Sequence, residues 1–358
     1  MRSLIQPLRH RAHTPLISIR SIHASIPKAA TPIAHPTAPG PPPPPPTTPT
    51  SDREARIARK KKQAALLRAA QTIRADAAKP TTTSPLKKRF WTDVHIIQSP
   101  EDGHYQIHLD ARPVRDIEKT LIKVPRSKPH LATALALEWD MLTSAQQALK
   151  THYIPLTSLV ARALEIQAAD GAGNAEPRAS IVRMLIRYLT TDTLLCWAPE
   201  PVGVDVGHDN LRARQRALAE PIVAHLTGRM WPGVRLEPTL ADSIVPKAQE
   251  QSSLDVVRGW LAGLPAWELA GVERAVLATK SLCVAARLVA EWSEELGLGS
   301  SEGKKFGVED AAIAVSAEVA WQTGQWGEVE DTHDVEKEDL RRQLGGVVLL
   351  VNGMKRTA

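Results

Sequence analysis

The chain has 358 residues, of which 43% are hydrophobic and 23% are charged, so it can bury the core of one or two ordinary domains. Its net charge of +6 is uneven: residues 1–90 carry a balance of +14, whereas residues 91–358 hold 28 basic and 36 acidic groups. The acidic balance of residues 91–358 excludes a nucleic-acid binder, which needs its basic patch on the folded part of the chain. Charged residues also interrupt every apolar stretch well short of the ~20 residues that a membrane helix needs.

The first 30 residues have the composition of a mitochondrial presequence. No Asp or Glu occurs in this segment, and Ser, Thr and small apolar residues separate its basic residues, which are Arg2, Arg9, Arg11, Arg20 and Lys28. A basic, hydroxyl-rich and acid-free start is typical of a mitochondrial transit peptide, whereas a secretory signal shows one compact apolar block. We therefore predict the mitochondrial matrix as the location. A merely disordered basic tail is the alternative.

Residues 31–86 are predicted to form a disordered Pro-rich and basic linker. The run Pro41–Pro46 has fixed φ angles and no amide donors, so it favours an extended, solvated spacer. Residues 52–78 have a helical pattern behind the basic run 59–62, but their apolar face is mostly alanine. A solvated linker helix is therefore favoured over a helix that lies on a membrane surface.

Residues 87–128 are predicted to form a small antiparallel β domain. Val94 and Ile96 alternate with polar residues, Asp102-Gly103 supplies a turn, and Ile107 and Leu109 continue the alternation. Period-two alternation on both sides of an Asp-Gly turn is the signature of a β-hairpin.

Residues 129–358 are predicted to form a larger, all-helical C-terminal domain, which makes the fold class α+β. Apolar residues recur at helical spacing, and Pro155 and Pro177 stand where helices begin. The predicted helices span 131–150, 156–167, 177–189, 211–226, 267–296, 309–322 and 329–351. We expect Cys196 and Cys283 to pack as small buried apolar groups. The cysteines and histidines lack metal-ligand spacing, so no metal site is expected.

The densest polar cluster that could carry chemistry contains Glu330, His333 and Asp334. A histidine flanked by carboxylates can serve as a general acid or base, which makes a hydrolase-like enzyme the alternative function. No nucleophile or anion hole stands nearby in the sequence. The competing interpretation is a helix N-terminus, where acidic residues interact favourably with the helix dipole.

Glu318 interrupts an apolar and alanine-rich run, residues 311–321. Its carboxylate either points to water, or is buried with a partner, or lies on a surface that receives another protein. Small alanine side chains allow another backbone to approach closely. An alanine-rich face with one charge therefore suits a docking groove.

Six motifs, in order over residues 88–345, carry a family resemblance. They are Lys88-Arg89-Phe90-Trp91, Leu109-Asp110-Ala111-Arg112-Pro113-Val114, Leu137-Glu138-Trp139-Asp140, Ile154-Pro155-Leu156-Thr157, Leu189-Thr190-Thr191-Asp192-Thr193 and Trp326-Gly327-Glu328-Val329-Glu330-Asp331-Thr332-His333-Asp334. Together they resemble the family of ATP synthase assembly factors that chaperone the alpha subunit of the F(1) sector. Local departures are Ile154, where the family has Met, residues 214–218, which lack the family's Trp-Asp-Pro, and the loop near 297–305, which is longer than in the family.

The resemblance implies a matrix protein without catalytic activity or cofactor, expected to be a monomer. It implies that the chain binds the free alpha subunit and covers surface that is later buried against beta. It also implies that acidic residues of the C-terminal helical domain contact this partner. The expected partner-binding residues are Glu318, Glu330 and Asp334, with Trp326, Gly327 and His333 shaping the site.

Overall fold

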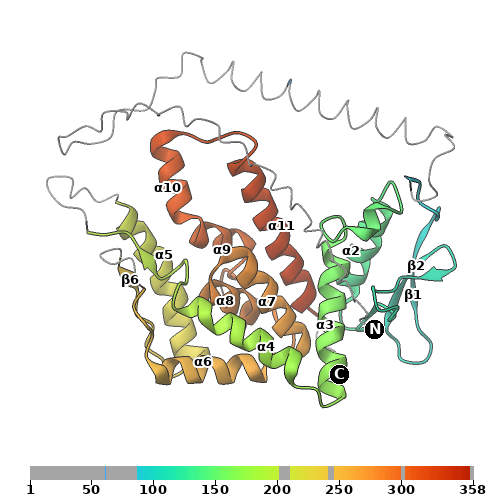
Figure 1. The fold of residues 1–358 in the computed structure, drawn as a ribbon, viewed down its shortest axis with the longest axis horizontal. Coiled ribbons are helices and arrows are strands. Elements are labelled where there is room, and N and C mark those ends of the chain that lie inside the picture. The colour runs from blue at the N-terminus through green and yellow to red at the C-terminus, as the bar shows by residue number, and fades with distance from the viewer. Residues whose placement is uncertain (1–60, 62–86, 201–209, 241–245, 300–302, 355–358) are drawn as a thin grey trace, which may run out of the picture. The chain divides into compact units, whose positions relative to one another are not determined.

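The computed structural model describes residues 61, 87–200, 210–240, 246–299 and 303–354 (Figure 1). All of them belong to one compact unit, which spans residues 47–358. The predicted presequence, and the predicted linker apart from Lys61, lie outside the described residues, so the boundaries proposed for them stay predictions.

The N-terminal part of the described chain is a small antiparallel sheet, as predicted. Its strands are β1 (Val94–Gln98), β2 (Tyr105–Leu109), β3 (Arg112–Pro113) and β4 (Lys123–Val124). β1 and β2 form the expected hairpin, with Ile96 opposite Ile107, and β3 and β4 both pair with β2. Gly103 has a φ of +71° in the turn, a conformation that glycine adopts without steric cost. The sheet packs against the first helix of the helical part, α2 (Figure 1).

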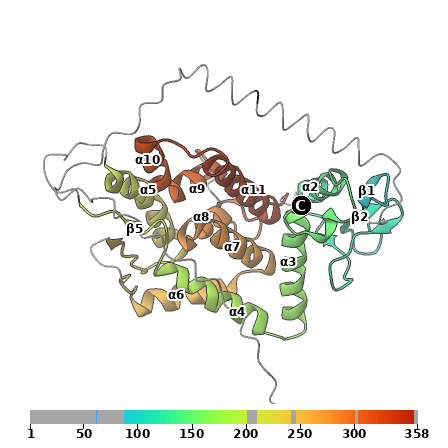
Figure 2. The ribbon, with the colours of Figure 1, turned by 45° about the horizontal axis from the view of Figure 1, so that its top comes forward.

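Helices make up most of the remaining described chain, and this confirms the α+β fold class. They are α2 (Pro129–Asp140), α3 (Pro155–Gly171), α4 (Glu176–Leu185), α5 (Leu211–His225), α6 (Gln251–Gly263), α7 (Ala266–Thr279), α8 (Leu282–Trp292), α9 (Val308–Val315), α10 (Ala317–Trp326) and α11 (His333–Val351). Short 3₁₀ turns span Gln147–Leu149 and Ile186–Leu189, and a π turn spans Leu226–Met230. α7 packs against α3, α8 and α11 (Figure 2). Within the described ranges, no helix is both long and apolar enough to cross a bilayer.

One predicted helix is in fact two. Residues 267–296 form α7 and α8, because Lys280 adopts the left-handed conformation at φ 57° and ends α7. The hydroxyl of Ser281 then accepts a hydrogen bond from the Val284 amide at 3.0 Å, which caps the start of α8. The buried carboxylate of Asp192 accepts another from the Cys283 amide at 2.9 Å. The break therefore depends on a residue 91 positions away, which local periodicity does not reveal.

Other sequence predictions fail locally. The helix predicted over 131–150 ends at Asp140, and the one predicted over 309–322 is divided at Ser316 into α9 and α10. Cys283 is buried as expected, but Cys196 is exposed. Cys196 lies in β5 (Cys196–Trp197), which pairs in parallel with β6 (Thr239–Leu240), a small surface sheet that the helical pattern does not indicate.

Two of the sequence motifs meet at the start of α3. The carboxylate of Glu138 accepts hydrogen bonds from the amides of Leu156, at 2.7 Å, and Thr157, at 2.9 Å. It also accepts one from the Thr157 hydroxyl at 2.6 Å, and that hydroxyl accepts a bond from the Trp139 indole N–H at 2.9 Å. Burial raises the pKa of Glu138, while these donors act in the opposite direction. Glu138 thus satisfies the amides that a helix N-terminus leaves without partners.

The first motif, Lys88-Arg89-Phe90-Trp91, connects the sheet side of the chain to α2. The ring of Trp91 packs edge-on against Trp139, with centroids 5.7 Å apart. The Arg89 guanidinium donates to the Asp140 carbonyl at 3.0 Å, and the Asp110 carboxylate accepts from the Asp93 amide at 2.9 Å. Trp139 therefore anchors the sheet to the helices through its contacts to Trp91 and Thr157.

Glu138→Ala is expected to lower the free energy of unfolding by about 2 to 4 kcal/mol, because it leaves the amides of Leu156 and Thr157 and the Thr157 hydroxyl without their acceptor. Urea denaturation followed by circular dichroism measures this loss. The matched control is Glu165→Ala on the exposed side of α3, where a surface ion pair with Arg162 contributes about 1 kcal/mol or less. Equal losses in the two variants would contradict a structural role for Glu138.

Candidate functional site

Glu318 lies in the first turn of α10 and is exposed. Its carboxylate accepts a hydrogen bond from the Gln322 side chain at 3.1 Å, and no residue of α10 is buried. Of the three interpretations of Glu318, burial with a partner is therefore wrong.

The end of α10 presents an exposed apolar surface. Trp326 is 52% exposed and packs edge-on against Trp321, with ring centroids 6.0 Å apart. The chain then turns at Gly327, whose φ of 87° and ψ of 164° are accessible without strain only to glycine. Val329 and Val335 are each more than half exposed. We call residues 326–335 the α10–α11 tip.

The polar cluster of the tip is a helix start. His333 is the first residue of α11 and Asp334 lies in its first turn, so the carboxylate interacts favourably with the helix dipole. The Nδ1 atom of His333 accepts a hydrogen bond from the Val329 amide at 3.0 Å, which fixes the turn. Glu330 and Asp334 are exposed. The structure thus brings Glu330, His333 and Asp334 together on an open surface.

None of these three side chains lines the pockets described below, and the described residues contain no cluster of His, Cys, Asp and Glu that could hold a metal ion. A hydrolase needs a concave site in which a nucleophile or an activated water meets the substrate. The geometry of the tip therefore does not favour the enzyme alternative.

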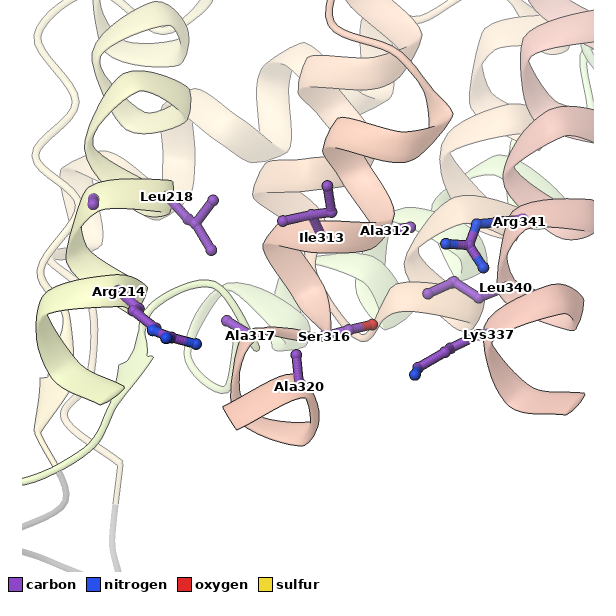
Figure 3. Close-up of a pocket in the computed structure, with 11 residues that line it drawn as sticks. Arg214, Leu218, Ala312, Ile313, Ser316, Ala317, Ala320, Lys337, Leu340 and Arg341 are labelled. Carbon is purple, nitrogen blue, oxygen red and sulfur yellow. The ribbon is translucent and has the colours of Figure 1, made fainter. Parts of the chain in front are cut away.

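An apolar groove lies beside the tip, and sequence reasoning only partly anticipates it. Two adjoining cavities, of 400 and 430 Å³, share residues of α5 and α9, and Figure 3 shows the first of them. The first is lined by Arg214, Ala217, Leu218, Ala312, Ile313, Ser316, Ala317, Ala320, Lys337, Leu340 and Arg341. We call the two cavities together the α5–α9 groove. Its alanines are those expected of a docking groove, but its charged lining residues are basic apart from Asp310, and Glu318 does not line it.

The far end of the groove contains a buried ion pair. Arg287 and Glu291 on α8 contact each other at 2.5 Å, and the Arg287 guanidinium lies 5.0 Å from the centre of the Phe306 ring. His225 of α5 lines the same end, and its buried Nε2 atom has no hydrogen-bond partner within the described ranges. Burial lowers the pKa of His225, and the positive charges of Arg287 and Arg229 lower it further. This end of the groove therefore disfavours an additional positive charge.

A larger cavity, of 780 Å³, lies between α2, α3 and α11. Its lining combines the buried Glu138 with the exposed side chains of Met141 and Tyr153. Sequence reasoning misses this cavity, because its walls come from helices far apart in the chain. Glu138 is already engaged there by the start of α3.

The chain is similar to known proteins over most of its length. Residues 88–227 match the family model described as ATP12 chaperone protein. The chain is 32% identical over 284 residues to protein ATP12, mitochondrial, of Saccharomyces cerevisiae, with 74% of this chain and 85% of that protein covered. It is 30% identical over 267 residues to protein atp12, mitochondrial, of Schizosaccharomyces pombe, with 74% and 82% covered.

The fold is also that of a solved structure. The crystal structure of Atp12 from Paracoccus denitrificans matches with a TM-score of 0.53 and 21% identity. The match covers 73% of this chain and 95% of that chain.

His225→Gln is expected to make stability less sensitive to acid. The pKa of His225 in the folded protein lies below its ordinary value of 6.5. The stabilisation is therefore fully present above 6.5 and is lost as the pH falls from there through the lowered folded-state pKa. Urea denaturation at about pH 7.5 and about pH 5.5 should show a larger drop for the wild type than for His225→Gln. His130→Gln, at an exposed position of α2, is the control and should behave like the wild type. Identical pH dependence in wild type and His225→Gln would contradict this origin.

Proposed function

Because the chain belongs to the ATP12 chaperone family, we propose that it is an assembly chaperone of the mitochondrial ATP synthase, which holds the free alpha subunit of the F(1) sector until the beta subunit replaces it. The family consists of chaperones and not of enzymes, so the hydrolase alternative for Glu330, His333 and Asp334 is set aside. An unpaired alpha subunit exposes a large apolar interface and is prone to aggregate. A chaperone of moderate affinity prevents this and is then displaced by the larger native interface.

We also propose the mitochondrial matrix as the site of action. The acid-free, basic composition of residues 1–30 supports this location, and both yeast relatives are named as mitochondrial proteins. The protein acts as a monomer in this proposal, so that its docking surfaces are open to the client.

The observation that carries the proposed function is the exposure of the α10–α11 tip. Residues of the other sequence motifs make internal contacts, as Glu138, Asp192 and Trp139 do, although Phe90 and Leu137 of those motifs are also exposed. The motif at 326–334 instead leaves Trp326 and Val329 largely exposed. A large aromatic side chain beside exposed valines, rimmed by polar groups, is characteristic of a protein-binding surface.

The charges of the tip indicate the kind of surface that it meets. Glu330 and Asp334 are exposed carboxylates of the tip, and Glu318 is an exposed carboxylate at the other end of α10. They complement a client surface with basic residues. Such complementary charges steer the encounter and favour the correct partner more than they add affinity. The apolar residues at the centre of the tip then provide most of the binding free energy.

Trp326→Ala and Glu318→Lys test this assignment. Trp326→Ala should weaken binding of the alpha subunit by about tenfold or more, because an exposed aromatic residue at the centre of an interface is a typical hot spot. Glu318→Lys should weaken capture through charge repulsion. Binding is measured by co-purification with tagged alpha subunit and by the light scattering of alpha subunit that aggregates in the presence of each variant.

Two substitutions far from the tip are the matched controls: Ile117→Ala, at an exposed apolar position after β3, and Glu165→Lys on α3. Both should retain wild-type capture. If the wild type itself does not capture alpha subunit, the proposed function is wrong. If the wild type captures alpha subunit and both Trp326→Ala and Glu318→Lys bind it as well as the wild type does, only the site assignment is wrong.

A further inference from the structure

We propose that the α5–α9 groove is a second docking surface, which receives an amphipathic helix of the client with carboxylates on both flanks of its apolar face. The inference rests on the proposed function for the existence of a client. It adds the chemistry of one client segment and the place where this segment binds.

The floor of the groove is apolar and open. Ile313 of α9 lines both cavities and is 53% exposed, although apolar side chains surround it. Ala217 on α5 lines both cavities as well. Ala317 and Ala320 on α10 line the first cavity (Figure 3). Side chains this small let a second backbone come close, as in helix pairs whose axes are about 8–10 Å apart. The lining residues thus provide a surface into which the apolar side of a helix can pack.

The rim of the first cavity is basic on both sides. Arg214 lies on the α5 side, and Lys337 and Arg341 lie on the α11 side (Figure 3). No acidic residue is among the side chains that line this cavity. Residues 91–358 as a whole carry eight more acidic than basic groups, so this concentration of positive charge runs against the composition of the folded chain. A helix with carboxylates on both flanks complements such a rim.

The rim cations can exchange their present partners. Arg341 contacts the Glu309 carboxylate at 2.6 and 3.1 Å, and Lys337 contacts Glu328. These acidic side chains are half exposed, and exposed ion pairs contribute about 1 kcal/mol or less. A client carboxylate that is partly desolvated against the apolar floor can therefore replace Glu309 or Glu328 as the partner of Arg341 or Lys337.

The second cavity continues the same pattern. Lys304 and Lys305 line it next to the buried Arg287, and its one acidic lining residue is Asp310, which contacts Lys304 at 2.5 Å. Lys305 lies 5.0 Å from the centre of the Trp292 ring. Basic side chains therefore line both cavities of the groove. An occupant rich in lysine and arginine is disfavoured here, in contrast to the acidic α10–α11 tip.

The experiment places a photo-crosslinking residue, benzoylphenylalanine, at position 313 of the full chain and illuminates it in the presence of alpha subunit. The matched control has the same residue at position 256, because Val256 on α6 is 42% exposed and lies outside the groove. We expect position 313 alone to crosslink to alpha subunit. Mass spectrometry should identify a segment with helical apolar periodicity flanked by Asp and Glu. Crosslinks to a second copy of this chain, to a Lys- and Arg-rich segment or to no partner while alpha subunit is still captured would overturn the inference.

Substitutions measure the contribution of the groove. Ile313→Asp and the double variant Arg214→Glu/Lys337→Glu should each weaken capture of alpha subunit by about tenfold or more. Arg216→Glu, on α5 but outside the groove lining, should stay within about twofold of the wild type. If the wild type captures alpha subunit and the groove variants bind equally well, only this inference fails. If the wild type captures none, the proposed function fails together with it.

Discussion

The contact between Glu138 and the first turn of α3 connects the sheet side of the described chain to its helices. α2 packs against β1 and β2, and its buried Glu138 accepts hydrogen bonds from the Leu156 and Thr157 amides at the start of α3. α3 in turn packs against the central helix α7. A buried carboxylate is costly unless its oxygens are well hydrogen-bonded, and a helix N-terminus supplies both donors and a favourable dipole. The two groups therefore satisfy each other, and neither is stable in this position without the other.

The buried carboxylate of Asp192 positions a helix start in the same way. This carboxylate accepts from the amides of Leu194 and Cys283 and so fixes the start of α8. Burial raises the pKa of Asp192, while these hydrogen bonds oppose the rise. The chain thus uses buried acids to position helices, whereas the acids Glu330 and Asp334 of the α10–α11 tip are exposed.

Sequence reasoning predicts the parts of the fold that local signals determine. The Asp102-Gly103 turn defines the hairpin, and Pro155 and Pro177 lie in the first turns of α3 and α4. It fails where distant residues take part, as after Lys280, where α7 ends and the buried Asp192 carboxylate accepts a hydrogen bond from the Cys283 amide at the start of α8. The exposure of Cys196 has the same origin, since it depends on a strand pairing with residues more than 40 positions later.

The candidate site divides in the same way. The tip is a continuous stretch of sequence, so its aromatic and acidic residues can be found by inspection. The groove is assembled from α5, α9, α10 and α11. Its basic rim can be recognised only once the fold places Arg214 and Arg341 on the two sides of the same cavity. The alanine-rich run at 311–321 indicates a docking face, but periodicity alone does not show that Glu318 lies outside it.

No residue of α10 is buried, and this has a consequence for how the proposed client would be released. α10 contacts α5 and α9 through its small side chains, so little apolar surface holds it in place. Segments of this kind open locally at a small fraction of the global unfolding free energy, and their amide hydrogens exchange early. α10 lies between the tip and the groove, so one such opening would loosen both surfaces while α7 and α8 stay folded. Departure of the client would then need no rearrangement of the core.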